Sequence, residues 1–327
     1  PVATPLTVTV LEDSGATTLT LAGSDLDNDP LTFAIVTPPT LGVLGPVTPV
    51  NATSATVTYT PNANANGTDT FTFRANDGQI NSANATATIT ITPVNDAPGF
   101  TATSPAAVNE DAGAQTIANW ATFNPGPPDE AGQTATYTVS AISNPALFST
   151  PPAVAPNGTL TYTPAANANG TSTYTVTVQD SGGTDNGGVN VSPPQTFTIT
   201  VNAINDAPVF TAGANQTVNE DAGAQTVNPW ATGISAGPPD EAGQTLSFNV
   251  TGNTNAALFS AAPAVSPTGV LTYTPAANAN GTATITLTLS DNGPGAPPPN
   301  ANTSPAQSFT ITVNAVNDAP VNTVPAA

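Results

Sequence analysis

Cysteine, histidine and methionine are absent from the 327-residue chain, and Arg74 is its only basic side chain. Without cysteine the chain has no disulfide, no thiolate metal site and no thiol redox chemistry. Without histidine it lacks the commonest general acid and base, and it has no lysine to activate a serine nucleophile. Whatever stiffens the chain must therefore be side-chain packing or a metal ion bound by oxygen atoms.

The shortage of positive charge excludes two classes of partner. The chain has 21 acidic residues and a net charge of −20. Proteins that bind nucleic acid or anionic lipid carry clusters of lysine and arginine. The sequence also contains no apolar run of about 18 residues, the length that a membrane-spanning helix needs. We therefore expect no nucleic-acid partner and no membrane insertion, and the lack of sulfur suits an extracellular location.

An ordered set of sequence markers occurs three times. The string Asn-Asp-Ala-Pro ends at Pro98, Pro208 and Pro320. An acidic pair precedes it at Glu12-Asp13, Glu110-Asp111 and Glu220-Asp221, and a Tyr-Thr-Pro segment begins at Tyr59, Tyr162 and Tyr273. Self-similarity of this kind indicates tandem domains. We predict repeat 1 at 1–98, repeat 2 at 99–208 and repeat 3 at 209–320, with 321–327 as a linker or the start of a further repeat.

Between the markers, apolar residues alternate with threonine, as in the run Phe71, Phe73 and Ala75. A period of two with many β-branched residues is typical of half-buried strands. In repeat 1 we predict strands at 5–11, 16–23, 31–37, 41–48, 55–60, 69–75 and 84–92. Seven short strands in a repeat of this size suit an antiparallel sandwich. The predicted fold is all-β, with three tandem seven-strand immunoglobulin-like sandwiches in an elongated rod, and with Trp120 and Trp230 filling cores.

Several segments together resemble a known family. They are the early Glu12-Asp13 pair, the segment DLDNDPLTF at 25–33, the segment YTPNANANGTDTFTFRANDG at 59–78 and the closing VNDAP at 94–98. This combination resembles the tandem immunoglobulin-like and cadherin-like repeats of large bacterial surface proteins. The resemblance implies a seven-strand sandwich and, in cadherin-like members, calcium at the joints between repeats. Cadherin joints carry an Asp-x-Asn-Asp-Asn pattern, whereas 92–96 reads TPVND and lacks the leading aspartate.

A seven-strand antiparallel topology also predicts where the acids lie. We call the end of a repeat that holds its first and fifth interstrand loops its C-terminal pole, and the end that holds its second and sixth loops its N-terminal pole. All 21 acids are expected in loops at these poles, with none on a strand face. The candidate calcium ligands at C-terminal poles are Glu12, Asp13, Asn95, Asp96, Glu110, Asp111, Asn205, Asp206, Glu220, Asp221, Asn317 and Asp318; those at N-terminal poles are Asp25, Asp27, Asp29, Asp77, Asp129, Glu130, Asp180, Asp240, Glu241 and Asp291.

Two interpretations of these acids remain open. Carboxylates facing one another across a joint repel unless a cation neutralises them, and one arginine is too few. A dication with six to eight oxygen ligands would do so, and calcium tolerates irregular, carboxylate-rich sites better than magnesium. In the other interpretation the acids are ordinary turn formers. That accounts for their place in loops, but less well for their absence from water-facing strand positions.

Two functions follow from this organisation. The first is a non-enzymatic structural segment of an extracellular adhesin stalk or filament, whose partners are further copies or repeats placed head to tail. The second is an adhesive module that binds a carbohydrate, a host or surface ligand, or a homophilic protein partner. A glycosidase-like carboxylate pair is disfavoured, because a catalytic pair seldom recurs at every joint. Because Pro1 begins in phase with the repeat, we also expect the chain to be part of a longer array or a stacking subunit.

Overall fold

A computed structural model describes residues 1–319 and consists of β-strands joined by loops and short 3-10 turns. The chain forms two compact units: the first comprises Pro1–Ala106, Ala114–Thr163 and Ser172–Ile199, and the second comprises Ala107–Gly113, Pro164–Thr171 and the chain from Thr200 onward. No helix in the described part has the length and apolarity to cross a membrane. The predicted segment 321–327 lies outside the described residues.

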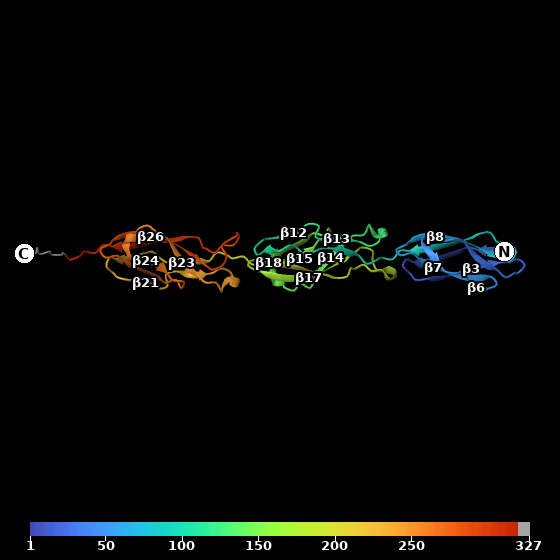
Figure 1. Ribbon diagram of the computed structural model, residues 1–327, viewed down its shortest axis with the longest axis horizontal. Coiled ribbons are helices and arrows are strands. Elements are labelled where there is room, and N and C mark those ends of the chain that lie inside the picture. The colour runs from blue at the N-terminus through green and yellow to red at the C-terminus, as the bar shows by residue number, and fades with distance from the viewer. Residues whose placement is uncertain (320–327) are drawn as a thin grey trace, which may run out of the picture. The chain divides into compact units, whose positions relative to one another are not determined.

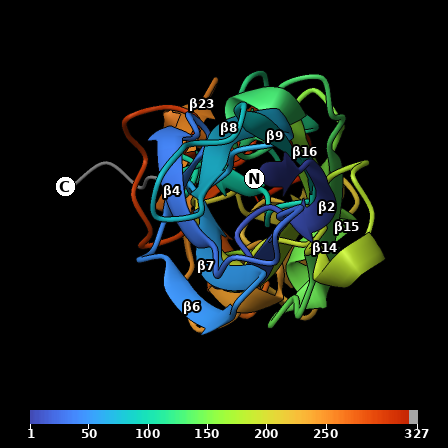
Figure 2. The same cartoon turned by 90° about the vertical axis from the view of Figure 1, so that its right-hand side faces the viewer.

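Repeat 1 is a sandwich of two sheets, as predicted. One sheet has the order β1 (Val2–Thr4), β3 (Thr17–Ser24), β7 (Ser54–Pro61) and β5 (Gly42–Leu44), with β6 (Thr48–Asn51) also on β7. The other has the order β2 (Leu6–Leu11), β9 (Ala85–Thr92), β8 (Gly67–Asn76) and β4 (Thr32–Thr37). Seen end-on, β4, β8 and β9 lie on one side of this repeat and β6 and β7 on the other (Figure 2).

The first predicted strand, 5–11, corresponds to β2, and the unpredicted strand β1 precedes it in the other sheet. β1 pairs antiparallel with β3, whereas β2 pairs parallel with β9. Pro5 stands between β1 and β2, and proline has no N–H with which to continue a strand ladder. The predicted strand 41–48 is divided into β5 and β6, which both pair with β7.

The core of repeat 1 follows the period-two pattern. Phe71, Phe73 and Ala75 of β8 point inward and are fully buried, whereas Thr72 and Arg74 between them point to the other face of the sheet. They pack against Leu21 of β3 and Tyr59 of β7 in one continuous core. Each such side chain contributes about 1.5–3 kcal/mol when it leaves water, so this alternation fixes the register of the sheets.

Repeats 2 and 3 share one strand order with each other. Figure 1 shows the labelled strands of repeat 2 mainly in green and those of repeat 3 in orange. Repeat 2 has β11 (Val108–Asn109), β18 (Gln195–Asn202), β17 (Gly170–Gln179) and β14 (Thr136–Ser140) in one sheet, β12 (Gln115–Ile117), β16 (Leu160–Pro164) and β15 (Phe148–Val154) in another, and a pair β10 (Gly99–Thr101) and β13 (Thr122–Asn124). Repeat 3 has β20 (Gln216–Asn219), β27 (Gln307–Asn314), β26 (Gly281–Ser290) and β23 (Ser247–Asn253), then β21 (Gln225–Val227), β25 (Leu271–Pro275) and β24 (Phe259–Val265), and a pair β19 (Val209–Thr211) and β22 (Thr232–Ser235).

Both tryptophans fill cores, as predicted. The Trp120 ring lies 4.8 Å from that of Phe197 in an edge-on arrangement, and the Trp230 ring lies 4.3 Å from that of Phe309. Each indole N–H donates to a backbone carbonyl, that of Thr103 at 2.7 Å and that of Ala214 at 3.1 Å. The tryptophans therefore bury their apolar surface without leaving a polar atom unpaired.

The expectation that no acid lies on a strand face is wrong for Asp69. This residue lies within β8 on the inward face and is 2% exposed. Its carboxylate accepts hydrogen bonds from the backbone N–H of Thr40 at 2.9 Å, that of Leu41 at 3.0 Å and the Tyr59 hydroxyl at 2.8 Å. Burial alone would raise the pKa of Asp69, but these hydrogen bonds outweigh it and lower the pKa. Asp69 is therefore a structural residue of the repeat 1 core.

Candidate functional site

The candidate site is the set of polar residues at joint 1, between repeats 1 and 2, and at joint 2, between repeats 2 and 3. All joint 1 residues described below belong to the first compact unit, and all joint 2 residues belong to the second.

At joint 1, Glu12 holds the C-terminal pole of repeat 1 together. It follows β2 and is 4% exposed. Its N–H donates to the carbonyl of Thr92 at 3.0 Å. Its Oε1 accepts a hydrogen bond from the N–H of Val94, which lies in the segment 93–98 that joins repeat 1 to repeat 2; we call this segment, and its counterpart 203–208 at joint 2, the linker. Asp13 accepts a hydrogen bond from the N–H of Asn64 at 2.9 Å. The first and fifth interstrand loops therefore do share this pole, as the topology predicted.

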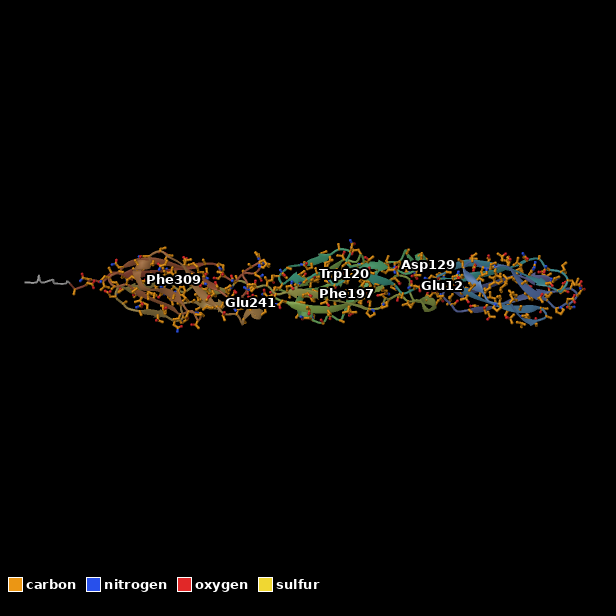
Figure 3. The ribbon with its side chains drawn as sticks, in the orientation of Figure 1. Glu12, Trp120, Asp129, Phe197, Glu241 and Phe309 are labelled. Carbon is orange, nitrogen blue, oxygen red and sulfur yellow. The ribbon has the colours of Figure 1, made fainter. Side chains whose placement is uncertain are left out.

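An asparagine amide connects carboxylates of the two repeats. Nδ2 of Asn66 donates to Oε2 of Glu12 at 3.3 Å and to Oδ2 of Asp129 at 2.7 Å. Glu12 and Asp129 accordingly lie beside each other at this junction (Figure 3). The predicted approach of acids from repeats 1 and 2 is present, with a neutral amide between this pair of carboxylates.

Glu130 is a buried acid on the repeat 2 side that contacts the linker. It ends the 3-10 turn η1 (Pro128–Glu130) and is 6% exposed. Its Oε1 accepts the N–H of Asp96 at 2.7 Å, while its Oε2 is buried without a hydrogen-bond partner among the described residues. Gly126 makes room for it: φ is +139° there, and a Cβ would lie 1.9 Å from Oε2 of Glu130.

Joint 2 repeats this arrangement. Nδ2 of Asn169 donates to Glu110 at 3.2 Å and to Asp240 at 2.9 Å. Glu241, in the 3-10 turn η4 (Pro239–Glu241), accepts the N–H of Asp206 at 2.7 Å and likewise keeps its Oε2 buried without a partner. The amide bridge and the buried glutamate therefore recur at both joints.

The two joints concentrate negative charge without a counter-ion. Burial first, and then repulsion from Asp13 and Asp129, raises the pKa of Asp96. The pKa of Glu130 is also raised, mainly by burial and further by Asp96, Asp129 and Asp180, despite its hydrogen bond from the Asp96 N–H. The equivalent pair at joint 2, Asp206 and Glu241, shows the same shifts from the same causes.

Each joint contains a cavity whose lining includes acidic and amide side chains. That of joint 1 has a volume of about 210 Å³ and is lined by Pro93, Val94, Asn95, Asp129, Glu130, Gln133 and Gly182. That of joint 2 has a volume of about 200 Å³ and is lined by Ala203, Ile204, Asn205, Asp240, Glu241, Gln244, Pro294 and Asn300. Over residues 1–319, no three acids are gathered closely enough to form a complete metal-binding group. The cavities nevertheless hold oxygen atoms that lack donors, which is the chemistry that suits a hard cation.

Comparison with known proteins places the repeats in a family. The profile of the bacterial Ig domain matches residues 95–192 and 205–297, more than half of the chain. The chain belongs to the bacterial Ig domain family. Residues 1–93 match the bacterial cadherin-like domain, so repeat 1 is a cadherin-like member of this tandem array of Ig-type repeats. Domains of these two families are typical of extracellular surface proteins and are typically non-enzymatic structural modules.

The Ig-type repeats also resemble solved cadherin structures. The extracellular cadherin domains 1-5 of protocadherin gamma B2 align with a TM-score of 0.54 and 14% identity over 96% of this chain. The protocadherin gammaB7 EC3-6 structure aligns with a TM-score of 0.51, also at 14% identity, over 94% of this chain and 72% of its own length. The chain spans 59% of the first of these proteins, and the likeness concerns the fold alone. A search of curated proteins gave no significant match.

Away from the joints, Asp25 and Asp77 of the cadherin-like repeat 1 accept hydrogen bonds from their own loops. At its N-terminal pole, Asp25 accepts the N–H of Asp27 at 2.9 Å and of Asp29 at 3.4 Å. Asp77 accepts the N–H of Gln79 and of Ile80, each at 2.7 Å. These bonds are typical of turn-forming aspartates. At this pole the structure thus favours the turn interpretation that the sequence left open.

The C-terminal pole of the last Ig repeat is preorganised like those at the joints. Glu220 accepts the N–H of Val316 at 2.7 Å and the amide of Asn280 at 3.4 Å, and Asp221 accepts the N–H of Asn278 at 3.2 Å. The predicted ligands Asn317 and Asp318 are exposed. Acids at this pole are therefore arranged by their own repeat, before any neighbour contributes.

Four amide side chains of the joints were not among the site residues predicted from the sequence. Asn66 and Asn169 bridge carboxylates, and Gln133 and Gln244 line the two cavities with an Oε1 that is buried and unpartnered. Their signal was present, since the asparagines belong to the recurring Asn-Gly of the Tyr-Thr-Pro marker and the glutamines to the recurring GPPDEAGQT segment.

Mild acidification is expected to stabilise the metal-free chain. Because the pKa of Asp96 and of Glu130 is raised in the folded state, the folded chain binds protons before the unfolded chain does as the pH falls. The free energy of unfolding should therefore rise as the pH drops from neutral to the ordinary values of 3.8 and 4.5 for these groups, and these groups add nothing further below them. The test is to measure the melting temperature in a chelator across this pH range. We expect the rise of the melting temperature with falling pH to be smaller in the Glu130→Gln, Glu241→Gln double variant. A melting temperature of the wild-type chain that falls with pH over this range would contradict the prediction.

Proposed function

We propose that the chain is a non-enzymatic structural segment of a bacterial surface stalk or filament, built from domains 1–98, 99–208 and 209–320, with joints stiffened by calcium. The observation that carries this proposal is the buried, donor-free Oε2 of Glu130 and its counterpart in Glu241. A buried carboxylate oxygen without a partner is costly, and nearby like charges increase the cost.

The residues at the joints fit an oxygen-ligated dication. At joint 1 the ion would be held by Glu130 and Asp129 together with neutral oxygens of the cavity, and at joint 2 by Glu241 and Asp240 with the corresponding neutral oxygens. Calcium, when bound, supplies the positive charge that the joint lacks. This chain's own residues position it: Gly126 allows Glu130 to lie against the linker, and the Asp96 N–H orients the carboxylate.

The distribution of aromatic residues supports a structural role over glycan binding. Carbohydrate sites usually present an exposed aromatic platform. In the described residues both tryptophans are buried, and so are Tyr59, Tyr162, Tyr174 and Tyr273. An adhesive function of these repeats would therefore rely on other surfaces, and specific binding of the purified chain to a glycan array would favour it.

Small-angle scattering tests the stiffening. We expect the maximum dimension of the full chain to be larger, and its conformational spread smaller, in millimolar calcium than in a chelator. Without the ion the like-charged ends of successive domains repel across a short linker, and this repulsion opposes the contacts that hold each joint, so the joints bend more than with the ion. The Asp77→Asn variant serves as control, because Asp77 is bonded within its own loop. Identical scattering in calcium and chelator would show that packing alone sets the shape.

A further inference from the structure

We infer that the side chain of the linker asparagine at each joint, Asn95 or Asn205, binds in a polar site on the following repeat, which we call the cradle. We call this set of contacts the latch, and it forms without metal. The cradle consists of Gln133, Asp180, Gly182 and the backbone of Val189 at joint 1. The inference goes beyond the calcium proposal and does not require it. It also assigns the two asparagines to repeat recognition and removes them from the candidate metal ligands.

The amide of Asn95 makes hydrogen bonds to repeat 2 through both its oxygen and its nitrogen. Its Oδ1 accepts from Nε2 of Gln133 at 2.7 Å. Its Nδ2 donates to the carbonyl of Val189 at 2.7 Å and lies 3.2 Å from Oδ2 of Asp180. The oxygen of the Asn95 amide thus faces a donor of repeat 2, and its nitrogen faces acceptors of repeat 2. The donors and acceptors of the amide therefore match those of the cradle.

The backbone of the same residue reinforces the contact. The N–H of Val189 donates to the carbonyl of Asn95 at 2.8 Å. Asn95 and Val189 therefore exchange hydrogen bonds through both the main chain and a side chain, which links the linker to the sixth interstrand loop of repeat 2. A hydrogen bond that involves the carboxylate of Asp180 adds a charge-assisted contact.

Glycine creates the space that the asparagine side chain fills. A Cβ on Gly182 would lie 1.5 Å from Oδ1 of Asn95, and one on Gly188 would lie 3.1 Å from its Cβ. Any side chain at position 182 would expel the asparagine. The recurring glycines of this loop thus have a specific steric purpose.

Joint 2 contains the same cradle with different loop residues. Asn205 is 4% exposed. Its Oδ1 accepts from Gln244 at 2.7 Å, its Nδ2 donates to the carbonyl of Ala301 at 2.6 Å and to Asp291 at 3.2 Å, and its carbonyl accepts the N–H of Ala301 at 2.7 Å. A Cβ on Gly293 would lie 1.7 Å from Oδ1. Two loops that differ in sequence have kept one set of contacts, which indicates selection for the latch.

The third copy of the marker has different surroundings. Asn317 is exposed, and within the described residues its side chain bonds only to the carbonyl of its neighbour Asp318, at 3.2 Å. Asn95 and Asn205, by contrast, each bond to residues of the repeat that follows them. Repeat 1 has no glutamine in its loop 25–31 and a shorter loop at 77–84, so it lacks the cradle of repeats 2 and 3. The latch consequently distinguishes which repeats can follow an Asn-Asp linker.

Amide hydrogen exchange of the full chain in a chelator tests the latch. We expect Asn95→Ala and Gln133→Ala each to speed exchange of the Val189 N–H by about tenfold or more, since each removes a hydrogen bond that holds the linker in the cradle, and to leave the Ala301 N–H unchanged. Asn205→Ala should have the reverse effect. Asn317→Ala is the matched control and should change neither amide. Unchanged exchange at Val189 in both Asn95→Ala and Gln133→Ala would overturn the inference.

Calcium separates this latch from the proposed function. If Asn95 were a metal ligand, Asn95→Asp would protect Val189 in calcium as well as the wild-type chain does, and that result would overturn the latch. We expect instead that Asn95→Asp exchanges faster with and without calcium, because it places a carboxylate against Asp180 and cannot donate. If the wild-type chain does not bind calcium but the variants show the exchange pattern above, the calcium proposal is refuted and the latch is supported.

Discussion

Replacing Phe197 with alanine is expected to lower the free energy of unfolding of repeat 2 by about 3–5 kcal/mol, the range for truncating a buried phenylalanine. The Phe197 ring packs 4.8 Å from Trp120, 5.9 Å from Tyr174 and 6.2 Å from Phe100. The alanine would leave a cavity among three aromatic rings that have little room to close it. A loss of this size consumes much of the stability of a small domain.

The two tryptophans allow this effect to be assigned to one repeat. In a Trp230→Phe background, Trp120 is the only tryptophan and reports repeat 2, so its fluorescence during denaturant unfolding measures the predicted loss. Thr196→Ala is the matched control, because Thr196 precedes Phe197 on the same strand and faces water. The control should stay within about 0.5 kcal/mol of its parent. An equally small effect of Phe197→Ala would mean that the repeat 2 core is not packed as described.

Calcium is expected to raise the melting temperature of the wild-type chain and to have little effect on the Glu130→Gln, Glu241→Gln double variant. Extracellular modules bind calcium with dissociation constants of about 10⁻⁴ to 10⁻³ M. At about 10 mM calcium this corresponds to a stabilisation of about 1.4–2.7 kcal/mol per ion, by mass action. The glutamines keep the size of the side chains and remove the buried charge that the ion would neutralise.

The double variant also makes an opposite prediction in a chelator. There the wild-type chain bears the cost of two buried carboxylates that lie among like charges, whereas the variant does not. We therefore expect the variant to melt above the wild-type chain in chelator and below it in calcium. Asp77→Asn should respond to calcium as the wild-type chain does. Parallel melting curves for all three proteins in both conditions would rule out Glu130 and Glu241 as the cation-binding groups.

Much of the fold could be predicted from the sequence because a half-buried strand has a period of two. That pattern located most strands of repeat 1 to within a few residues, missing β1 and joining β5 with β6, and it placed Phe71, Phe73 and Ala75 in the core. The antiparallel topology then fixed which loops share a pole, and the bond between Asn64 and Asp13 confirms that placement. Both inferences depend on local pattern and connectivity, which a single sequence contains.

What the sequence could not give depends on contacts between distant residues. Asp69 is buried because Tyr59 and the backbone at 40–41 supply its donors, and nothing in the strand pattern distinguishes it from a surface acid. Similarly, the bridging role of Asn66 requires Glu12 and Asp129 to approach from two repeats. A polar residue in a loop predicts hydrogen bonding, but only the folded chain determines its partner.

Equilibrium dialysis with radioactive calcium tests calcium binding at the joints, since it counts the ions bound to the full chain. We expect saturable binding by the wild-type chain with a dissociation constant of about 10⁻⁴ to 10⁻³ M. We also expect Glu130→Gln and Glu241→Gln each to remove the calcium bound at one joint, and the double variant to bind none at either joint. No saturable binding by the wild-type chain, or wild-type binding by the double variant, would contradict the calcium proposal.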